Sequence, residues 1–198
     1  MSLGEFLPFD PREGVQVKTG AALPHWTQVG RTAFVTWRTA DSIPRKVLES
    51  FREDRAGWLE SRGIDVSESG WRDRVSALPS DKRKEYWREF GNRWLDLLDE
   101  GLGSCPLRRP DCANTVAKAL RHFDGERYQL GDFVIMPNHV HVLVTPTEPW
   151  TIWKICWSWK KFSATRINEL LGTEGRFWQS ESFDHLVRDI HSLRAFQR

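Results

Sequence analysis

Two histidines lie one residue apart within residues 136–145, a stretch whose other residues alternate as in a half-buried β-strand. Side chains two positions apart on a strand point to the same face of its sheet. The two faces carry Val140, Val142 and Val144 on one side and His139, His141, Leu143 and Thr145 on the other. Because the valine face is apolar, it must pack on a core. This strand therefore belongs to a sheet that is covered on its valine side.

The histidine pair is a candidate metal site. Neutral imidazole is the commonest metal ligand among side chains. Two imidazoles on one face of a strand stand about 6–7 Å apart, close enough to chelate one divalent ion. The alternative is a pair of surface histidines beside a turn. The spacing alone leaves both interpretations open, because His-x-His often occurs by chance.

The order of the expected elements defines the fold class. Periodicity and turn residues predict a strand at 32–38, a helix at 41–59, a strand hairpin at 127–145, a helix at 150–171, a strand within 177–188 and a helix from Ile190. This order is β-α-β-β-α-β. We therefore expect an α+β fold, a ferredoxin-like antiparallel sheet with its helices on one face. His139 and His141 would lie on the other, open face.

The remaining segments elaborate this scheme. Residues 1–30 contain scattered proline and glycine without periodicity, which predicts an irregular leader. We assign residues 31–198 to one domain with a helical insertion at about 63–123. Its clearest helix carries the aromatic stripe Trp87, Phe90 and Trp94, and another helix begins near Pro110. The sequence does not indicate a role for residues 46–100.

Composition limits the classes of partner. The chain has 29 Lys and Arg against 27 Asp and Glu, a formal charge of +2, so a nucleic-acid surface must come from local clustering of charge. Three cysteines at irregular spacing fit neither a disulfide framework nor a zinc ribbon. The N-terminus lacks the pattern of a signal peptide, and no apolar run approaches the ~18 residues of a membrane span. We expect a cytoplasmic protein without membrane contacts, either monomeric or dimeric.

The helix expected at 150–171 carries the clearest local cluster of charge. Lys154, Trp157 and Lys161 follow each other at i, i+3 and i+7, a pattern suited to phosphate contacts combined with base stacking. The alternative is a solvated helix face with an isolated tryptophan. The predicted DNA-binding residues are Lys154, Trp157, Lys160, Lys161, Arg166 and Arg188.

The segment Val134-Ile-Met-Pro-Asn-His-Val-His-Val-Leu-Val144 resembles the HUH motif of single-strand transposases, in the family of REP-associated tyrosine transposases (RAYT). The resemblance covers about residues 31–45 and 100–198. Its further segments are 34–44, 122–125, 159–162, 177–179 and 184–189.

This resemblance implies a metal-dependent DNA endonuclease and strand transferase, an enzyme of DNA transposition and recombination. Its partner would be single-stranded DNA or hairpin-forming repeat DNA, which would make the protein nucleoid-associated. The resemblance assigns His139 and His141 as ligands of Mg²⁺ or Mn²⁺, which would polarise the scissile phosphate. A tyrosine would attack that phosphate to form a covalent phosphotyrosine.

The nucleophilic tyrosine is where the sequence departs from the family pattern. The resemblance places it on a helix after residues 184–189, so we expect it beyond Arg198. The two tyrosines present, Tyr86 and Tyr128, both precede the histidines and match no family position. Two alternatives therefore remain. One is a catalytically inactive module that binds repeat hairpins. The other is a metal-dependent hydrolase in which His139, His141 and His185 hold an ion that activates water.

Overall fold

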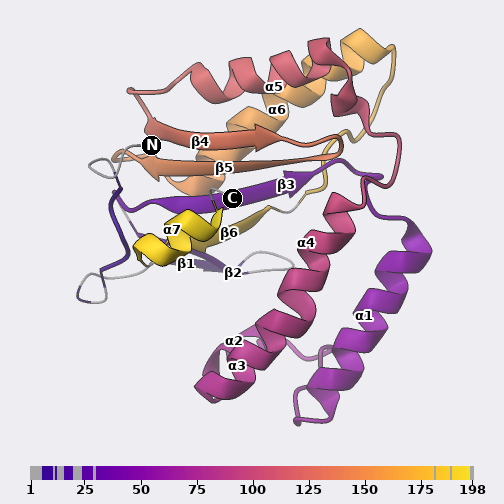
Figure 1. Ribbon diagram of the computed structural model, residues 1–198, viewed down its shortest axis with the longest axis vertical. Helices are drawn as coiled ribbons and strands as arrows, with labels where there is room; N and C mark the ends of the chain where they lie inside the picture. The colour runs from indigo at the N-terminus through magenta and orange to yellow at the C-terminus, as the bar shows by residue number, and fades with distance from the viewer. Residues whose placement is uncertain are drawn as a thin grey trace. The chain divides into compact units, whose positions relative to one another are not determined.

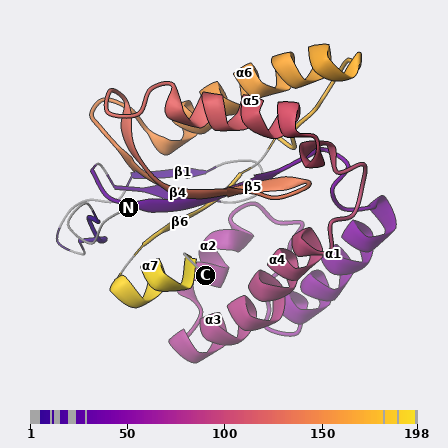
Figure 2. The same ribbon diagram turned by 45° about the horizontal axis from the view of Figure 1, so that its top comes forward.

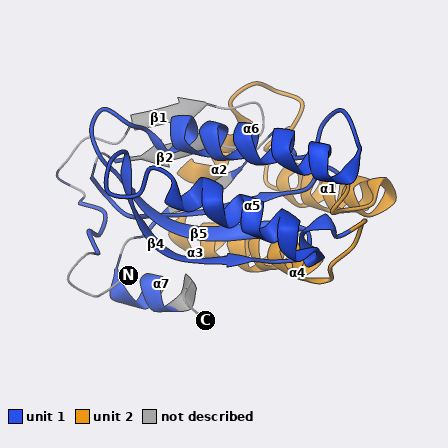
Figure 3. Ribbon diagram, turned by 90° about the horizontal axis from the view of Figure 1, so that it is seen from above, with its two compact units in different colours: residues 1–40, 105–198 blue, residues 41–104 orange. Residues whose placement is uncertain are grey.

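The computed structural model describes residues 6–10, 12, 16–19, 24–28, 30–180, 182–187 and 189–196 (Figure 1). The chain divides into two compact units (Figure 3). Unit 1 comprises residues 1–40 and 105–198, and unit 2 comprises residues 41–104. Each unit has its own cluster of buried apolar side chains.

Unit 1 is built on a four-stranded sheet in the order β4-β5-β3-β6. Its strands are β3 (Ala33–Arg38), β4 (Tyr128–Ile135), β5 (His139–Pro146) and β6 (Phe183–Leu186). Every neighbouring pair is antiparallel, and β3 pairs with both β5 and β6. The two central strands, β3 and β5, are the first and the third of these four strands along the chain, which is the ferredoxin-like order. The predicted α+β class is confirmed.

Two long helices cover one face of this sheet (Figure 2). Helix α5 (Pro110–Arg121) follows the 3₁₀ turn η2 (Pro106–Arg108) and begins with a proline, whose fixed φ suits the first helical turn. Helix α6 (Ile152–Leu171) ends at Gly172, which adopts the left-handed conformation. Both helices pack on the valines of β5 and on Trp37 of β3. The valine face is therefore the covered face, as predicted.

The opposite face of the sheet is partly covered as well. Helix α7 (Ile190–Phe196) places Leu193 against Phe34 and Leu143, and Val187 joins the same cluster. Our expectation of an open face is corrected here. The apolar side chains of β3 and β5 on this face need a cover, and the C-terminal helix supplies it.

Unit 2 is helical. It contains α1 (Arg45–Glu60), α2 (Trp71–Ala77), α3 (Ser80–Tyr86), the π-helical turn η1 (Trp87–Gly91) and α4 (Asn92–Asp99). Aromatic side chains dominate its core: Phe51 meets Phe90 edge-on at 6.0 Å between ring centroids. Trp71 and Val75 of helix α2 are buried there. The other five residues of α2 are not buried, so its apolar pattern is too short to indicate a helix.

The boundaries of unit 2 differ from the insertion expected at about 63–123. Helix α1, which we expected to follow the first strand as the crossover helix, buries Phe51 and Leu59 in the core of unit 2. Helix α5 instead places Val116 and Leu120 against the sheet. Both helices have an apolar stripe with the same period. Periodicity therefore cannot indicate which core each stripe joins.

The N-terminal segment also differs from the expectation of an irregular leader. Strands β1 (Gln16–Thr19) and β2 (Pro24–Thr27) form an antiparallel pair. Pro24 occupies the first position of its strand, where a missing N–H is tolerated.

In the part of the chain that the structure describes, no helix combines the length and apolar character needed to cross a membrane.

Candidate metal centre and nucleic-acid surface

The turn before β5 holds the histidine pair in place. The Thr39 N–H donates to the Asn138 carbonyl at 2.8 Å, and the Leu107 N–H donates to the Pro137 carbonyl at 3.1 Å. These bonds tie the turn to the end of β3 on one side and to η2 on the other. The residue that enters β5 next is His139. Its backbone is therefore fixed by neighbouring segments of unit 1.

His139 and His141 point to the same side of β5, as predicted. Their rings meet edge-on with centroids 4.5 Å apart, and the two Nε2 atoms are 2.8 Å apart. Two imidazole nitrogens that bind one ion at about 2.0–2.1 Å, with roughly 90° between the bonds, lie roughly 3 Å apart. The observed separation is close to that value. The two donor atoms therefore fit a divalent ion bound to both.

Each imidazole has a second partner at its other ring nitrogen. The Oδ1 atom of Asn138 lies 2.8 Å from Nδ1 of His139, and Oγ1 of Thr36 lies 2.7 Å from Nδ1 of His141. The ring of Phe34 stacks on His141 with centroids 5.3 Å apart and 16° between the planes. Both rings are therefore held at two points. Sequence reasoning missed Thr36 and Asn138, because the residue opposite His141 depends on the register of β3 against β5.

Burial determines the charge of His139. His139 has no exposed surface, and burial lowers its pKa to about 3, with a further contribution from the nearby His141. The imidazole of His139 is therefore neutral at neutral pH. Neutral imidazole is the form that binds a metal. The chemistry of the donor set thus agrees with the geometry.

Two further predicted site residues fall outside the described side chains. His185 lies in β6 opposite Phe34, but its side chain is not among those described. Arg188 lies entirely outside the described residues. Their predicted roles in metal and DNA binding remain predictions.

Tyr128 lies on the wrong face of the sheet to serve the histidine pair. Its hydroxyl donates to the Leu120 carbonyl at 2.7 Å and accepts the Trp159 indole N–H at 2.8 Å. Only 1% of the residue is exposed, and burial raises its pKa. It packs with α5 and α6, and it pairs with Pro146 at the end of β5 remote from His139.

Tyr86 is equally unsuited to attack a phosphate in this fold. It is 8% exposed in the aromatic core of unit 2, where burial raises its pKa. A nucleophilic phenol must reach its phosphate and lose its proton. Neither tyrosine of this chain meets these two conditions in the observed fold.

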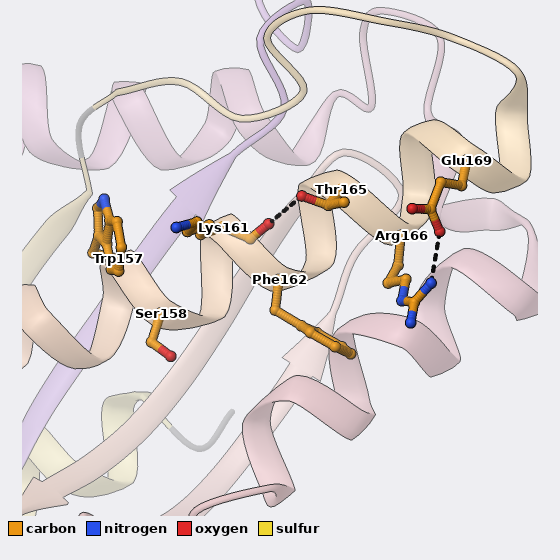
Figure 4. A pocket seen from close by; sticks show the side chains of 7 residues that line it. All are labelled: Trp157, Ser158, Lys161, Phe162, Thr165, Arg166 and Glu169. Carbon is orange, nitrogen blue, oxygen red and sulfur yellow. Dashed lines mark hydrogen bonds and ion pairs between the residues drawn. The ribbon is translucent and has the colours of Figure 1, made fainter.

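The outer side of α6 carries the predicted stripe of basic and aromatic residues. Lys154, Trp157 and Lys161 are exposed, Trp157 to 62%. The Nζ atom of Lys161 lies 4.7 Å from the centroid of the Trp157 ring, and the two side chains lie next to each other in Figure 4. They border a shallow depression of about 510 Å³. Its lining residues are Trp157, Ser158, Lys161, Phe162, Thr165, Arg166 and Glu169.

Three other residues of α6 refine the prediction. The spacing of the apolar residues in α6 predicts Phe162 on its buried side. Phe162 is nevertheless 48% exposed, because the face toward the sheet centres on Trp159, Ser163 and Ile167. Lys160 donates to the Ser180 carbonyl at 2.9 Å. Arg166 pairs with Glu169 at 2.8 Å, so its charge is partly neutralised. Lys154 and Lys161 are therefore the stronger candidates for phosphate contacts.

The two candidate sites lie on opposite sides of the sheet. Helix α6 covers the valine face, and its exposed side is turned away from the strands, whereas His139 and His141 are on the other face. A helix is about 10–12 Å thick with its side chains. One phosphate therefore cannot contact the α6 stripe and the histidine pair at the same time.

Comparisons with known proteins find several structural neighbours, and two of them are transposases. One is a REP-associated tyrosine transposase bound to a REP hairpin: 12% identity, 89% of this chain and 67% of that chain covered, TM-score 0.42. The other is a presumed transposase from Deinococcus radiodurans R1: 12% identity, 91% of this chain and 92% of that chain covered, TM-score 0.35. No family model and no curated protein sequence matches the chain.

Proposed function

We propose that this chain is a DNA-processing domain of the single-strand transposase type, which holds a divalent ion at His139 and His141 and binds single-stranded or hairpin DNA. The observation that carries this proposal is the 2.8 Å approach of the two Nε2 atoms on one face of β5. The segment that holds them resembles the HUH motif. The ferredoxin-like sheet supports the same proposal.

The chemistry of the pair suits phosphate esters. A bound Mg²⁺ or Mn²⁺ polarises a phosphoryl oxygen and stabilises the negative charge that develops when the phosphodiester is attacked. His139 is buried and neutral, so it offers a lone pair at neutral pH without first losing a proton. His141 is half-buried beside it. The pair would therefore hold the ion at the border between the interior and the solvent, where a DNA strand can approach.

The outer side of α6 would bind another part of the DNA. Lys154 and Lys161 supply charge for phosphates, and Trp157 supplies an exposed ring for base stacking. Because this surface lies across the sheet from the histidine pair, its contribution should not depend on the metal. Lys160, Arg166 and Arg188 complete the proposed DNA-binding set.

The test of the proposal is the metal dependence of DNA binding. We expect a labelled hairpin with single-stranded flanks to bind more tightly in Mn²⁺ than in EDTA. This increment should disappear when His139 and His141 are both replaced by alanine, while the affinity in EDTA stays at the wild-type value. Equal affinity of the wild type in Mn²⁺ and in EDTA would contradict the proposal.

We further expect the 198-residue chain to form no covalent DNA adduct through its own tyrosines. The Tyr128 hydroxyl is occupied by two hydrogen bonds on the far face of the sheet, and Tyr86 is buried in unit 2. The measurement incubates the chain with labelled hairpin DNA and Mn²⁺ and looks for a labelled protein band under denaturing conditions. A band that disappears in Tyr128→Phe would show that this expectation is wrong.

Substitutions on α6 should separate charge from stacking. Lys154→Ala or Lys161→Ala should reduce the slope of log affinity against log salt by roughly one unit, since each removes one phosphate contact. Trp157→Ala should cost about 1–3 kcal/mol of binding to single strands. Lys118→Ala, an exposed lysine of α5, is the matched control and should leave the slope unchanged. If all three α6 variants bind like the wild type, the DNA surface lies elsewhere.

A second candidate function is the recognition of repeat hairpins without cleavage. The burial of both tyrosines favours it, because the observed fold then offers DNA contacts without a phenol that reaches the histidine pair. Binding in Mn²⁺ without strand cleavage, also after the tyrosine-bearing helix of the family has been appended to the chain, would support this second function.

A further inference from the structure

We propose that Thr36 and Asn138 are positioning residues for the histidine pair: Asn138 sets the hydrogen position on His139, Thr36 holds the ring of His141, and together they direct both Nε2 atoms toward one ion. This inference rests on the proposed metal role of His139 and His141. It concerns two side chains that are themselves almost fully buried, at 3% and 0% exposure. Neither is predicted to contact the ion or the DNA.

Asn138 fixes His139. A carbonyl oxygen only accepts hydrogen bonds, so the 2.8 Å contact of its Oδ1 with Nδ1 of His139 requires the imidazole hydrogen on Nδ1. The Nε2 atom of His139 then carries the lone pair that a metal needs. The main chain of Asn138 is held in turn by the Thr39 N–H at 2.8 Å. This bond holds the backbone of Asn138 in place, and so helps to keep its side chain next to the ring of His139.

Thr36 fixes His141 from the neighbouring strand. The two residues are directly opposite in the antiparallel register of β3 and β5. Their side chains meet at 2.7 Å between Oγ1 and Nδ1. Phe34, two residues earlier on β3, stacks on the same imidazole. Ring plane and ring rotation are thus set by two side chains of one strand.

Asn138 and Thr36 differ in the hydrogen positions that they permit on the histidine beside each of them. Because Nε2 of His139 accepts, the 2.8 Å contact between the Nε2 atoms makes His141 the donor, and its Nδ1 accepts the Thr36 hydroxyl. When both Nε2 atoms bind one ion, the hydrogen of His141 must sit on Nδ1. A hydroxyl can then accept it by rotating about its own C–O bond. Thr36 thus serves both hydrogen positions of His141 without a change in the ring.

The effect of losing such a hydrogen-bond partner on metal affinity has a typical size. Metal-binding histidines usually hydrogen-bond through their second nitrogen, and removing that partner lowers metal affinity about 10–100-fold. We therefore expect Thr36→Val to weaken Mn²⁺ binding about 10–100-fold in calorimetry. Thr36→Ser restores the hydroxyl and should bind close to the wild type. At the other ring, Asn138→Leu should weaken binding, and Asn138→Asp, which keeps an acceptor, should not.

Thr145→Val is the matched control. It removes a buried threonine hydroxyl from the same strand as His141, where Oγ1 of Thr145 contacts Oγ1 of Thr32 at 2.9 Å. It should leave Mn²⁺ affinity at the wild-type value. Circular dichroism of every variant checks that the fold is retained.

Nitrogen NMR of the metal-free protein supplies a readout that does not need the ion. We expect His139 to carry its hydrogen on Nδ1 and His141 on Nε2, and Thr36→Val to change the signals of His141 more than those of His139. Wild-type Mn²⁺ affinity in Thr36→Val, or equal weakening in Thr36→Ser and Thr36→Val, would overturn the proposal. If the wild type binds no Mn²⁺, the proposed function fails, whereas the imidazole signals still decide whether Thr36 positions His141.

Discussion

Replacing both His139 and His141 with alanine is expected to abolish Mn²⁺ binding measured by calorimetry. The pair supplies the two nitrogen donors that converge at 2.8 Å, and alanine offers no ligand atom at either position. The loss should be complete, because the double substitution removes both nitrogen donors of the proposed site.

His122→Ala provides the control for this experiment. His122 is an exposed histidine of unit 1 that contacts Phe123 and lies outside the pair, so its loss should leave Mn²⁺ affinity unchanged. Calorimetric binding that persists in the double variant at wild-type affinity would place the metal site elsewhere. Binding that is lost equally in His122→Ala would show that Mn²⁺ binding also requires His122, which contradicts a site formed by the pair alone.

Trp37→Ala should cause the largest loss of stability among the changes considered. Trp37 is 1% exposed at the centre of the sheet, where it stacks on Trp159 at 5.7 Å and meets Trp178 edge-on at 6.1 Å. Replacing a buried tryptophan with alanine costs about 3–5 kcal/mol. Domains of this kind are stabilised by only about 5–15 kcal/mol in total. Urea denaturation should therefore show a much lower midpoint.

Trp157→Ala makes the same chemical change on the surface and is the matched control. Its ring is 62% exposed, so we expect the free energy of unfolding to stay within about 0.5 kcal/mol of the wild type. A large decrease in the free energy of unfolding for Trp157→Ala, together with a small decrease for Trp37→Ala, would contradict the assignment of Trp37 to the core and Trp157 to the surface. The pair of variants also separates stability from DNA binding, because only Trp157 lies on the proposed DNA surface.

The strands and the long helices could be predicted from the sequence because each buries one periodic face. The alternation around His139 and His141 places the valines and the histidines on opposite faces, and the structure confirms it. The same reasoning placed Lys154 and Trp157 on the exposed side of α6. These predictions depend on local geometry, which the spacing of residues determines.

Predictions that depend on distant parts of the chain were less successful. An apolar stripe on α1 and another on α5 look alike in sequence, yet the first joins the core of unit 2 and the second covers the sheet. The cover that α7 forms over Phe34 and Leu143 could not be inferred from its own residues. The partnership of Thr36 with His141 requires the register of two strands far apart in the chain, and no short-range pattern encodes it.

The placement of β3 has a consequence for the order in which the chain can fold. This strand is at the centre of the sheet, but both of its neighbours come from much later in the chain: Thr32 and Thr145, which are hydrogen-bonded, are 113 residues apart. Contacts between distant residues form slowly because a long loop must close first. Unit 2 consists of consecutive residues and needs no such closure. During synthesis on a ribosome, the helices of unit 2 can therefore assemble before β5 and β6, the two neighbours of β3, have been made. Until β5 has been synthesised, the backbone hydrogen-bonding groups of β3 are unpaired, which makes this strand prone to aggregation.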